Sequence, residues 1–178
     1  MQVEKKVLYN SLRLNWLRDP SIDVEPWQVE NYRELSTEQL FVGLKVLDIS
    51  LDRDSFLAYA ENFDTPGELA PYLTGDDFPT RLSDQVFLIS FELWRRILPQ
   101  KQSLPIFCDE LDYQIHQYDE GRIDADSLQD VISYLEEVLE ENCVEDAEPP
   151  EVFQSISTCC AHDLEGFIYD FIAGQIDE

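Results

Sequence analysis

The two histidines are the residues of this chain best suited to metal binding, because imidazole nitrogens and nearby carboxylates are common ligands of transition metals. Each lies one helical turn from an acid, in Asp112-x-x-x-His116 and in His162-x-x-Glu165. If the two segments faced each other, these side chains would form a mixed site. The paired Glu-x-x-His motifs of a carboxylate-bridged site are absent, so we predict no metal ligand. A metal-binding or metal-dependent helical-bundle enzyme is kept as an alternative function.

The segment that begins at His116 resembles half of a calcium-binding EF-hand loop, since Gly121 occupies the sixth position. Its ligand positions do not fit. His116, Tyr118 and Ser127 stand at the first, third and twelfth positions, where calcium needs carboxylate or amide oxygens. A joint between two helices, with Gly121 in the turn and Asp124 capping the second helix, explains the same residues. We therefore predict a joint without bound calcium.

Cysteine chemistry gives no clear site either. The four cysteines, Cys108, Cys143, Cys159 and Cys160, are too few for a disulfide scaffold of this length, and we expect all of them to be reduced apolar residues. The run from Cys159 to His162 lacks the separated Cys-x-x-Cys spacing of a zinc site. No Gly-x-Ser-x-Gly elbow and no glycine-rich phosphate loop occurs. We predict no catalytic residue, no cofactor and no enzymatic activity.

Net charge is the extreme property of the chain, at −26 with a pI of about 4.1. Residues 102–178 hold 21 acidic residues and one base, Arg122, whereas residues 1–101 hold 17 acids and 11 bases. An anionic surface repels nucleic acid and anionic lipid and attracts basic proteins. We therefore expect a basic protein partner, with no direct contact to nucleic acid or membrane.

Within this acidic half, one predicted helix tolerates charges that work against it. Glu136 and Glu140, and likewise Glu137 and Glu141, are like charges four residues apart, and each pair opposes the helix by roughly 0.2–0.5 kcal/mol. Glu140 and Glu141 also lie near the negative end of the helix dipole. A solvated face in a protein adapted to salt is the alternative to a binding role. The predicted partner-binding residues are Asp119, Glu120, Glu136, Glu137, Glu140 and Glu141.

The most apolar run, residues 86–98, is too polar for a membrane span, because it carries Ser90, Glu92, Arg95 and Arg96. We expect the two arginines to lie at the rim of a buried helix and to pair with neighbouring acids. The amino-terminal residues lack the pattern of a signal peptide, so we expect a cytoplasmic protein.

Helical periodicity predicts an all-α fold of eight to nine helices, arranged as a compact multi-helix bundle or a short superhelical stack. Residues 1–178 are predicted to form a single domain, with an ordered connector at residues 19–35 and an acidic half from about residue 102. The segment of residues 83–98 is apolar around nearly its whole circumference, which predicts a helix at the centre of the core. The predicted helix caps are Ser36 with Gln39, Asp52, Thr65, Ser103 and Asp124.

Two inner faces bear on the predicted function. Residues 103–121 are expected to bury Leu104, Phe107, Leu111 and Ile115. The last helix is expected to dock on the core, with its inner face formed by Leu164, Phe167, Ile168, Phe171 and Ile172. Carboxylates of the second half would then point outward.

These features together predict a non-catalytic interaction protein, such as an adaptor, a chaperone-like binder or an inhibitor. Acidic helices around residues 109–120 and 126–151 would engage the basic partner. A structural subunit that binds through an apolar groove is a further alternative. Added salt distinguishes this structural subunit from the acidic interaction protein, because screening weakens charge-driven association more than association through apolar burial.

Overall fold

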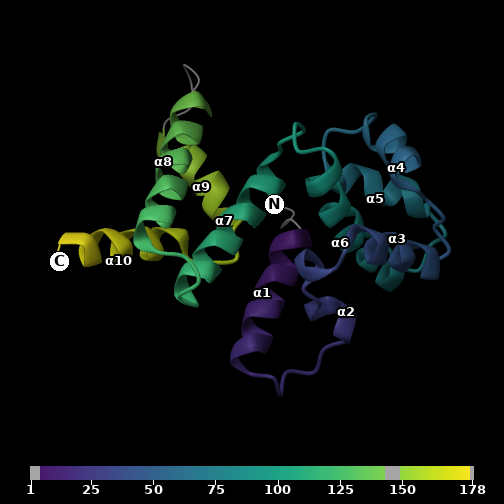
Figure 1. Ribbon diagram of the computed structural model, residues 1–178, viewed down its shortest axis with the longest axis horizontal. Helices are drawn as coiled ribbons and strands as arrows, with labels where there is room; N and C mark the ends of the chain where they lie inside the picture. Colours follow the sequence, from purple (N-terminus) through teal and green to yellow (C-terminus); the bar gives the residue numbers. More distant parts are fainter. Residues whose placement is uncertain (1–4, 143–148, 177–178) are drawn as a thin grey trace. The chain divides into compact units, whose positions relative to one another are not determined.

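The computed structural model describes residues 5–142 and 149–176 (Figure 1). Within these residues the chain forms ten α-helices and one 3₁₀ helix, with no strand, which confirms the all-α class. The contacts divide the chain into two compact units. We call Met1–Ser11 with Leu104–Glu178 the C-terminal unit, and Leu12–Ser103 the N-terminal unit. A single domain over residues 1–178 stays a prediction.

The C-terminal unit is built mainly from four helices: α7 (Leu104–Asp119), α8 (Ala125–Asn142), α9 (Pro149–Thr158) and α10 (Leu164–Ile176). The first residues of α1 (Lys5–Arg18) belong to it as well. Each of the four helices contributes apolar side chains at helical spacing to one core. The buried members of this core are Cys108, Leu111, Ile115, Leu135, Ile156, Cys160 and Leu164.

The joint between α7 and α8 has the predicted form. Gly121 adopts a left-handed backbone with φ 68°, which glycine accepts without a steric penalty. Asp124 then accepts a hydrogen bond from the Ser127 amide at 2.9 Å and so caps α8. Because α7 runs to Asp119, the first four positions of the calcium-loop resemblance are helical.

The predicted inner face of α7 is wrong in part. Leu104 is exposed, whereas Asp109 and Asp112 are buried beside Leu111 and Ile115. The apolar stripe is therefore rotated, and two carboxylates of the acidic half point inward. Each has a partner that compensates for its burial.

The N-terminal unit surrounds α6 (Thr80–Ile97), whose residues from Val86 to Trp94 are all buried, as predicted for a central helix. Its other helices are α3 (Thr37–Val46), α4 (Arg53–Ala60), α5 (Pro66–Thr74), the four-residue α2 (Pro26–Val29) and the 3₁₀ helix η1 (Tyr32–Glu34). The predicted connector thus contains two short helices.

Two of the predicted caps in this unit are confirmed. The Gln39 amide donates to Ser36 Oγ at 3.2 Å while the Ser36 amide donates to Gln39 Oε1 at 2.7 Å. Asp52 accepts from the Ser55 amide at 2.8 Å. These bonds satisfy amides that have no partner inside α3 and α4.

Two predicted hydroxyl caps are wrong. Thr65 stands at the N-cap of α5 but makes no capping bond through its side chain. The Glu68 carboxylate accepts from the Asp64 amide at 2.9 Å, just before the helix. Ser103 Oγ is buried with no hydrogen-bond partner. Pro105, at the second position of α7, has no amide hydrogen that Ser103 could bind.

The carboxyl-terminal end of α4 is bound by a lysine for which the sequence analysis predicted no role. Lys101 Nζ donates to the carbonyl oxygens of Glu61 and Phe63, each at 2.8 Å. The same ammonium lies 5.7 Å from the centre of the Trp94 ring, and Trp94 Nε1 donates back to the Lys101 carbonyl at 3.2 Å. A cation at this negative helix end stabilises α4.

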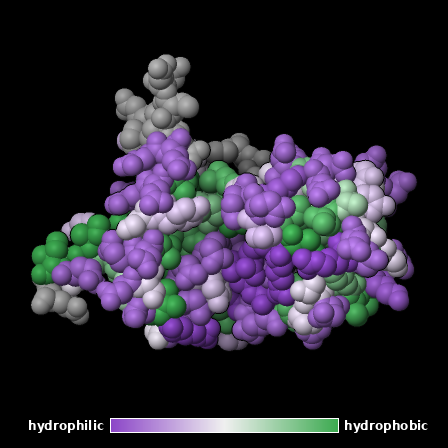
Figure 2. All heavy atoms as spheres, turned by 45° about the horizontal axis from the view of Figure 1, so that its top comes forward, coloured by the Kyte–Doolittle hydropathy of each residue, from purple (hydrophilic) through white to green (hydrophobic). Residues whose placement is uncertain are grey.

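The prediction that α10 packs on the core is confirmed, but its predicted inner face is wrong at Ile172. Leu164 and Phe171 are buried, but Ile172 is 50% exposed and Ile176 is 78% exposed. Apolar side chains at the free end of this helix stand out in the space-filling view (Figure 2). Among the described helices, none has the length and apolar character needed to cross a lipid bilayer.

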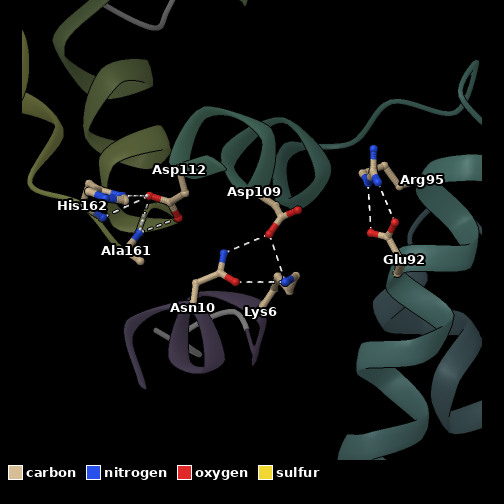
Figure 3. A network of polar contacts seen from close by, with 8 residues as sticks. All are labelled: Lys6, Asn10, Glu92, Arg95, Asp109, Asp112, Ala161 and His162. Atoms are coloured by element: carbon tan, nitrogen blue, oxygen red, sulfur yellow. Dashed lines mark hydrogen bonds and ion pairs between the residues drawn. The ribbon is translucent and has the colours of Figure 1, made fainter. Parts of the chain in front are cut away.

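The expected pairing of the two arginines is confirmed. Glu92 is buried in α6, and Arg95 binds it with two hydrogen bonds, from Nε at 3.0 Å and from Nη2 at 2.5 Å (Figure 3). Arg96 Nε donates to the same carboxylate at 2.6 Å. Arg96 Nη2 also donates to the carbonyl oxygens of Tyr32 and Arg33, and thereby fixes η1 to α6.

We predict that Glu92→Gln destabilises the N-terminal unit by about 3–5 kcal/mol, because it leaves two guanidinium groups without their compensating charge. All the tryptophans, Trp16, Trp27 and Trp94, belong to this unit, so tryptophan fluorescence during urea unfolding measures its stability. Asp76→Asn is the control, since Asp76 is exposed and its change is worth about 0.5 kcal/mol or less. Equal stability of the two variants would contradict the prediction.

Candidate partner-binding surface

Within the C-terminal unit, the buried carboxylate of Asp112 on α7 makes the main polar contact with the turn between α9 and α10. Its oxygens accept hydrogen bonds from the Ala161 amide at 2.8 Å and the His162 amide at 3.0 Å (Figure 3). His162 Nδ1 lies 2.9 Å from the same carboxylate. Both amides belong to the turn between α9 and α10, where no helix supplies their acceptor. Asp112 therefore fixes this turn to α7.

A carboxylate on Nδ1 also orients the imidazole, as in catalytic and metal-bound histidines. The nearby thiol does not complete a nucleophilic site. Cys108 Sγ donates to the Ile156 carbonyl oxygen at 3.6 Å. A hydrogen bond with Cys160, together with burial, raises the pKa of the Cys108 thiol well above its ordinary value. Because the thiolate is the nucleophile, Cys108 acts as a packed apolar residue.

The histidine and carboxylate set of the metal hypothesis is brought together only in part. Asp112 meets His162, but no group of three or more His, Cys, Asp or Glu side chains among the described residues is arranged to hold a metal ion. Cys108, Cys159 and Cys160 carry thiols. The expectation for Cys143 falls outside the described residues.

Asp109, one turn before Asp112, fixes the start of α1 to α7. Its Oδ1 lies 3.0 Å from Lys6 Nζ and accepts a hydrogen bond from Asn10 Nδ2 at 2.9 Å (Figure 3). Lys6 and Asn10 are bonded to each other as well, at 2.9 Å. The expectation that the acids around residues 109–120 form one outer surface is therefore wrong for Asp109 and Asp112, which stabilise the fold.

The six predicted partner-binding carboxylates all lie on the outside. The inner face of α8 is buried through Leu128 and Leu135, so the acids on the remaining faces point into solvent. Arg122 Nη2 pairs with Glu120 at 3.1 Å. The exposed predicted residues are Asp119, Glu120, Glu136, Glu137, Glu140 and Glu141; their role in binding stays a prediction.

Four of them form what we call the α8 acidic face: Glu136, Glu137, Glu140 and Glu141. Within the part of the chain that the structure describes, these side chains take part in no hydrogen bond and no ion pair. No lysine or arginine occurs in α8, so no positive side chain in its last turn offsets the negative end of the helix dipole. Among the described residues, the acidic face therefore makes no polar contact that stabilises the fold.

Comparisons of the chain with protein-family models, with curated proteins and with solved structures found no match.

Sequence reasoning did not find the contact between Asp112 and His162. The available signal was that Asp109 and Asp112 fall one turn apart among the apolar residues of α7, which places acids on a face expected to be buried. Their partners come from distant parts of the chain, at Lys6, Ala161 and His162, and no local pattern reveals such pairs.

We predict that Asp112→Asn destabilises the C-terminal unit by at least about 2 kcal/mol, because hydrogen bonds to a charged acceptor are worth roughly 1.5–3 kcal/mol each. Amide hydrogen exchange at Ala161 and His162 should accelerate, and urea unfolding followed by far-UV circular dichroism should shift to lower concentration. Asp119→Asn, an exposed change on the same helix, should leave both unchanged. Slow exchange at both amides in Asp112→Asn would refute this role.

The cap of α8 makes a pH-dependent contribution to stability. Hydrogen bonds from the Ser127 side chain and amide hold the pKa of Asp124 below its ordinary value of 3.8. A lowered pKa means that ionised Asp124 stabilises the folded chain above this value, and that the contribution is lost as the pH falls through the lowered pKa.

We predict that the stability advantage of Asp124 over the neutral cap in Asp124→Asn is larger at pH 7 than at pH 3. Asparagine caps helices about as well as aspartate but carries no charge that titrates. Urea unfolding of both proteins at the two pH values measures the difference. The same difference at pH 7 and pH 3 would contradict the prediction.

Proposed function

We propose that this chain is a non-catalytic interaction protein, acting as an adaptor, a chaperone-like binder or an inhibitor, and that the α8 acidic face engages a basic protein partner. Thiols rather than disulfides at Cys108, Cys159 and Cys160 fit a reducing compartment such as the cytoplasm.

The observation that carries the proposal is the contrast between two sets of carboxylates. The buried acids Glu92, Asp109 and Asp112 are each bonded to a cation or to several donors. The α8 acidic face has no such contact among the described residues, although its like charges oppose the helix that carries it. Charges without a stabilising contact among the described residues are available to a partner.

The expected encounter is electrostatic. The chain carries a net charge of −26. Its acidic surface therefore attracts a basic protein and raises the rate of association at low salt. Nucleic acid is a poor ligand for the same surface, because binding phosphates requires lysine or arginine side chains. Residues 102–178 contain only one, Arg122.

Neutralising the α8 acidic face tests the proposal. Wild type and a variant with Glu136, Glu137, Glu140 and Glu141 changed to Gln are used as baits in affinity purification with quantitative mass spectrometry. We expect the wild type to capture a basic protein, and we expect the amount captured by the variant to be lower by about tenfold or more. Added salt should weaken the complex.

A control variant removes the same charge from the N-terminal unit, with Asp23→Asn, Glu61→Gln, Asp76→Asn and Asp77→Asn, all at exposed positions. It should capture the partner as the wild type does. The α8 variant should also melt at a higher temperature than the wild type, since it loses two like-charge pairs worth roughly 0.2–0.5 kcal/mol each. Equal capture by all three proteins would defeat the proposal.

A further inference from the structure

The outer side of α10 carries an apolar stripe with no partner among the described residues. Tyr169 is 73% exposed, Ile172 50% and Ile176 78%, and Ala173 is exposed beside them. Their spacing of three, one and three residues places all four on one side of the helix. We call Tyr169, Ile172, Ala173 and Ile176 the α10 stripe.

The opposite side of α10 is firmly packed. Phe171 is buried against Leu128 and Ile132 of α8. The Tyr118 ring makes edge contacts with Phe167 and Phe171, with ring centres 6.1 and 5.7 Å apart. The stripe is therefore presented by a helix that is already formed and anchored, so that a ligand need not order it on binding.

The free end of α10 leaves room for another helix. Residues 172–176 are all exposed, and a side chain added at Gly174 would meet nothing within 4 Å. A helix that is apolar on both sides is normally buried on both. Only one side of α10 is covered by the described residues, and the apolar patch at its end is visible in Figure 2.

The charges around the stripe select the occupant. Glu165 lies on the same side one turn before Tyr169, Asp170 lies next to the stripe, and α10 contains no lysine or arginine. The carboxyl-terminal end of α10 is also the negative end of its dipole. A second copy of this chain would bring like charges to the contact, and an anionic lipid surface would be repelled. A helix with an apolar face bordered by lysines and arginines matches both features.

We propose that the α10 stripe is the docking site for a basic amphipathic helix of the partner. This inference rests on the proposed function and adds the apolar contact that fixes the partner after its charge has guided the encounter. It corresponds to the pairing of two amphipathic helices, as in coiled-coil zippers, in which apolar anchors at helical spacing supply the affinity.

The test uses a synthetic peptide of about 18 residues, made of leucine and lysine with the leucines on one helical face. A peptide of the same composition with shuffled order, and one with glutamate in place of lysine, are the ligand controls. The wild-type chain should bind the first peptide, and Ile172→Ala with Ile176→Ala should weaken binding by about tenfold or more. Alanine has a high helix propensity, so the variant should keep α10 helical, and far-UV circular dichroism checks this.

The chain offers a matched control for this variant. Val42 and Val46 on α3 are also four residues apart and 60% and 77% exposed, but Lys45 lies between them. Changing both to alanine removes a similar apolar pair from a site with the wrong charge, and should leave peptide binding unchanged.

Four outcomes would overturn the inference. They are equal peptide binding by the α10 variant and wild type, equal binding of the lysine and glutamate peptides, a wild-type dimer in analytical ultracentrifugation that the α10 variant loses, and binding to phosphatidylcholine vesicles that depends on Ile172 and Ile176. If the α10 variant captures the basic partner from cells as wild type does while the α8 variant does not, this inference fails and the proposed function stands.

Discussion

The C-terminal unit depends on one buried carboxylate, that of Asp112. A turn between two helices leaves amides without acceptors, and at the turn between α9 and α10 two of these amides donate hydrogen bonds to Asp112 of α7. The same carboxylate holds the His162 ring. Three helices thus meet at one charge, and α10 leaves the core from a fixed point. Apolar packing of Leu164 and Phe171 on the neighbouring helices then sets which side of α10 is covered.

The scarcity of bases explains why the outer surface is so negative. Several of the few lysines and arginines are committed to the fold: Lys6 to Asp109, Arg95 and Arg96 to Glu92, and Lys101 to the end of α4. Burial makes these pairings necessary, because an unpaired buried charge is costly. An exposed carboxylate has no such requirement, since water solvates it. Lys6, Arg95 and Arg96 therefore lie beside buried acids, and among the described residues the exposed acids Glu136, Glu137, Glu140 and Glu141 of α8 have no basic partner.

The all-α class, the central position of α6 and the caps at Ser36, Asp52 and Asp124 were predictable from the sequence, because apolar periodicity and capping bonds are local properties. The side-chain caps at Thr65 and Ser103 were not, since residue type and spacing do not fix whether the hydroxyl turns toward the helix amides. For the candidate surface, the exposure of the α8 carboxylates followed from its heptad-like inner face. The inward turn of Asp109 and Asp112 did not, because their partners lie far away in the sequence.

The helix α10 shows why burial cannot be read from apolar content alone. Periodicity predicts an inner face that includes Ile172, yet Ile172 is exposed together with Tyr169 and Ile176. Both sides of α10 are apolar, and only tertiary packing decides which one the chain covers. An uncovered apolar stripe is a hazard, because it invites association between copies. The acids in and around α10, with no base among its residues, oppose such pairing between identical chains. The same charges favour a cationic helix, so that a single distribution of charge disfavours self-association and admits a basic partner.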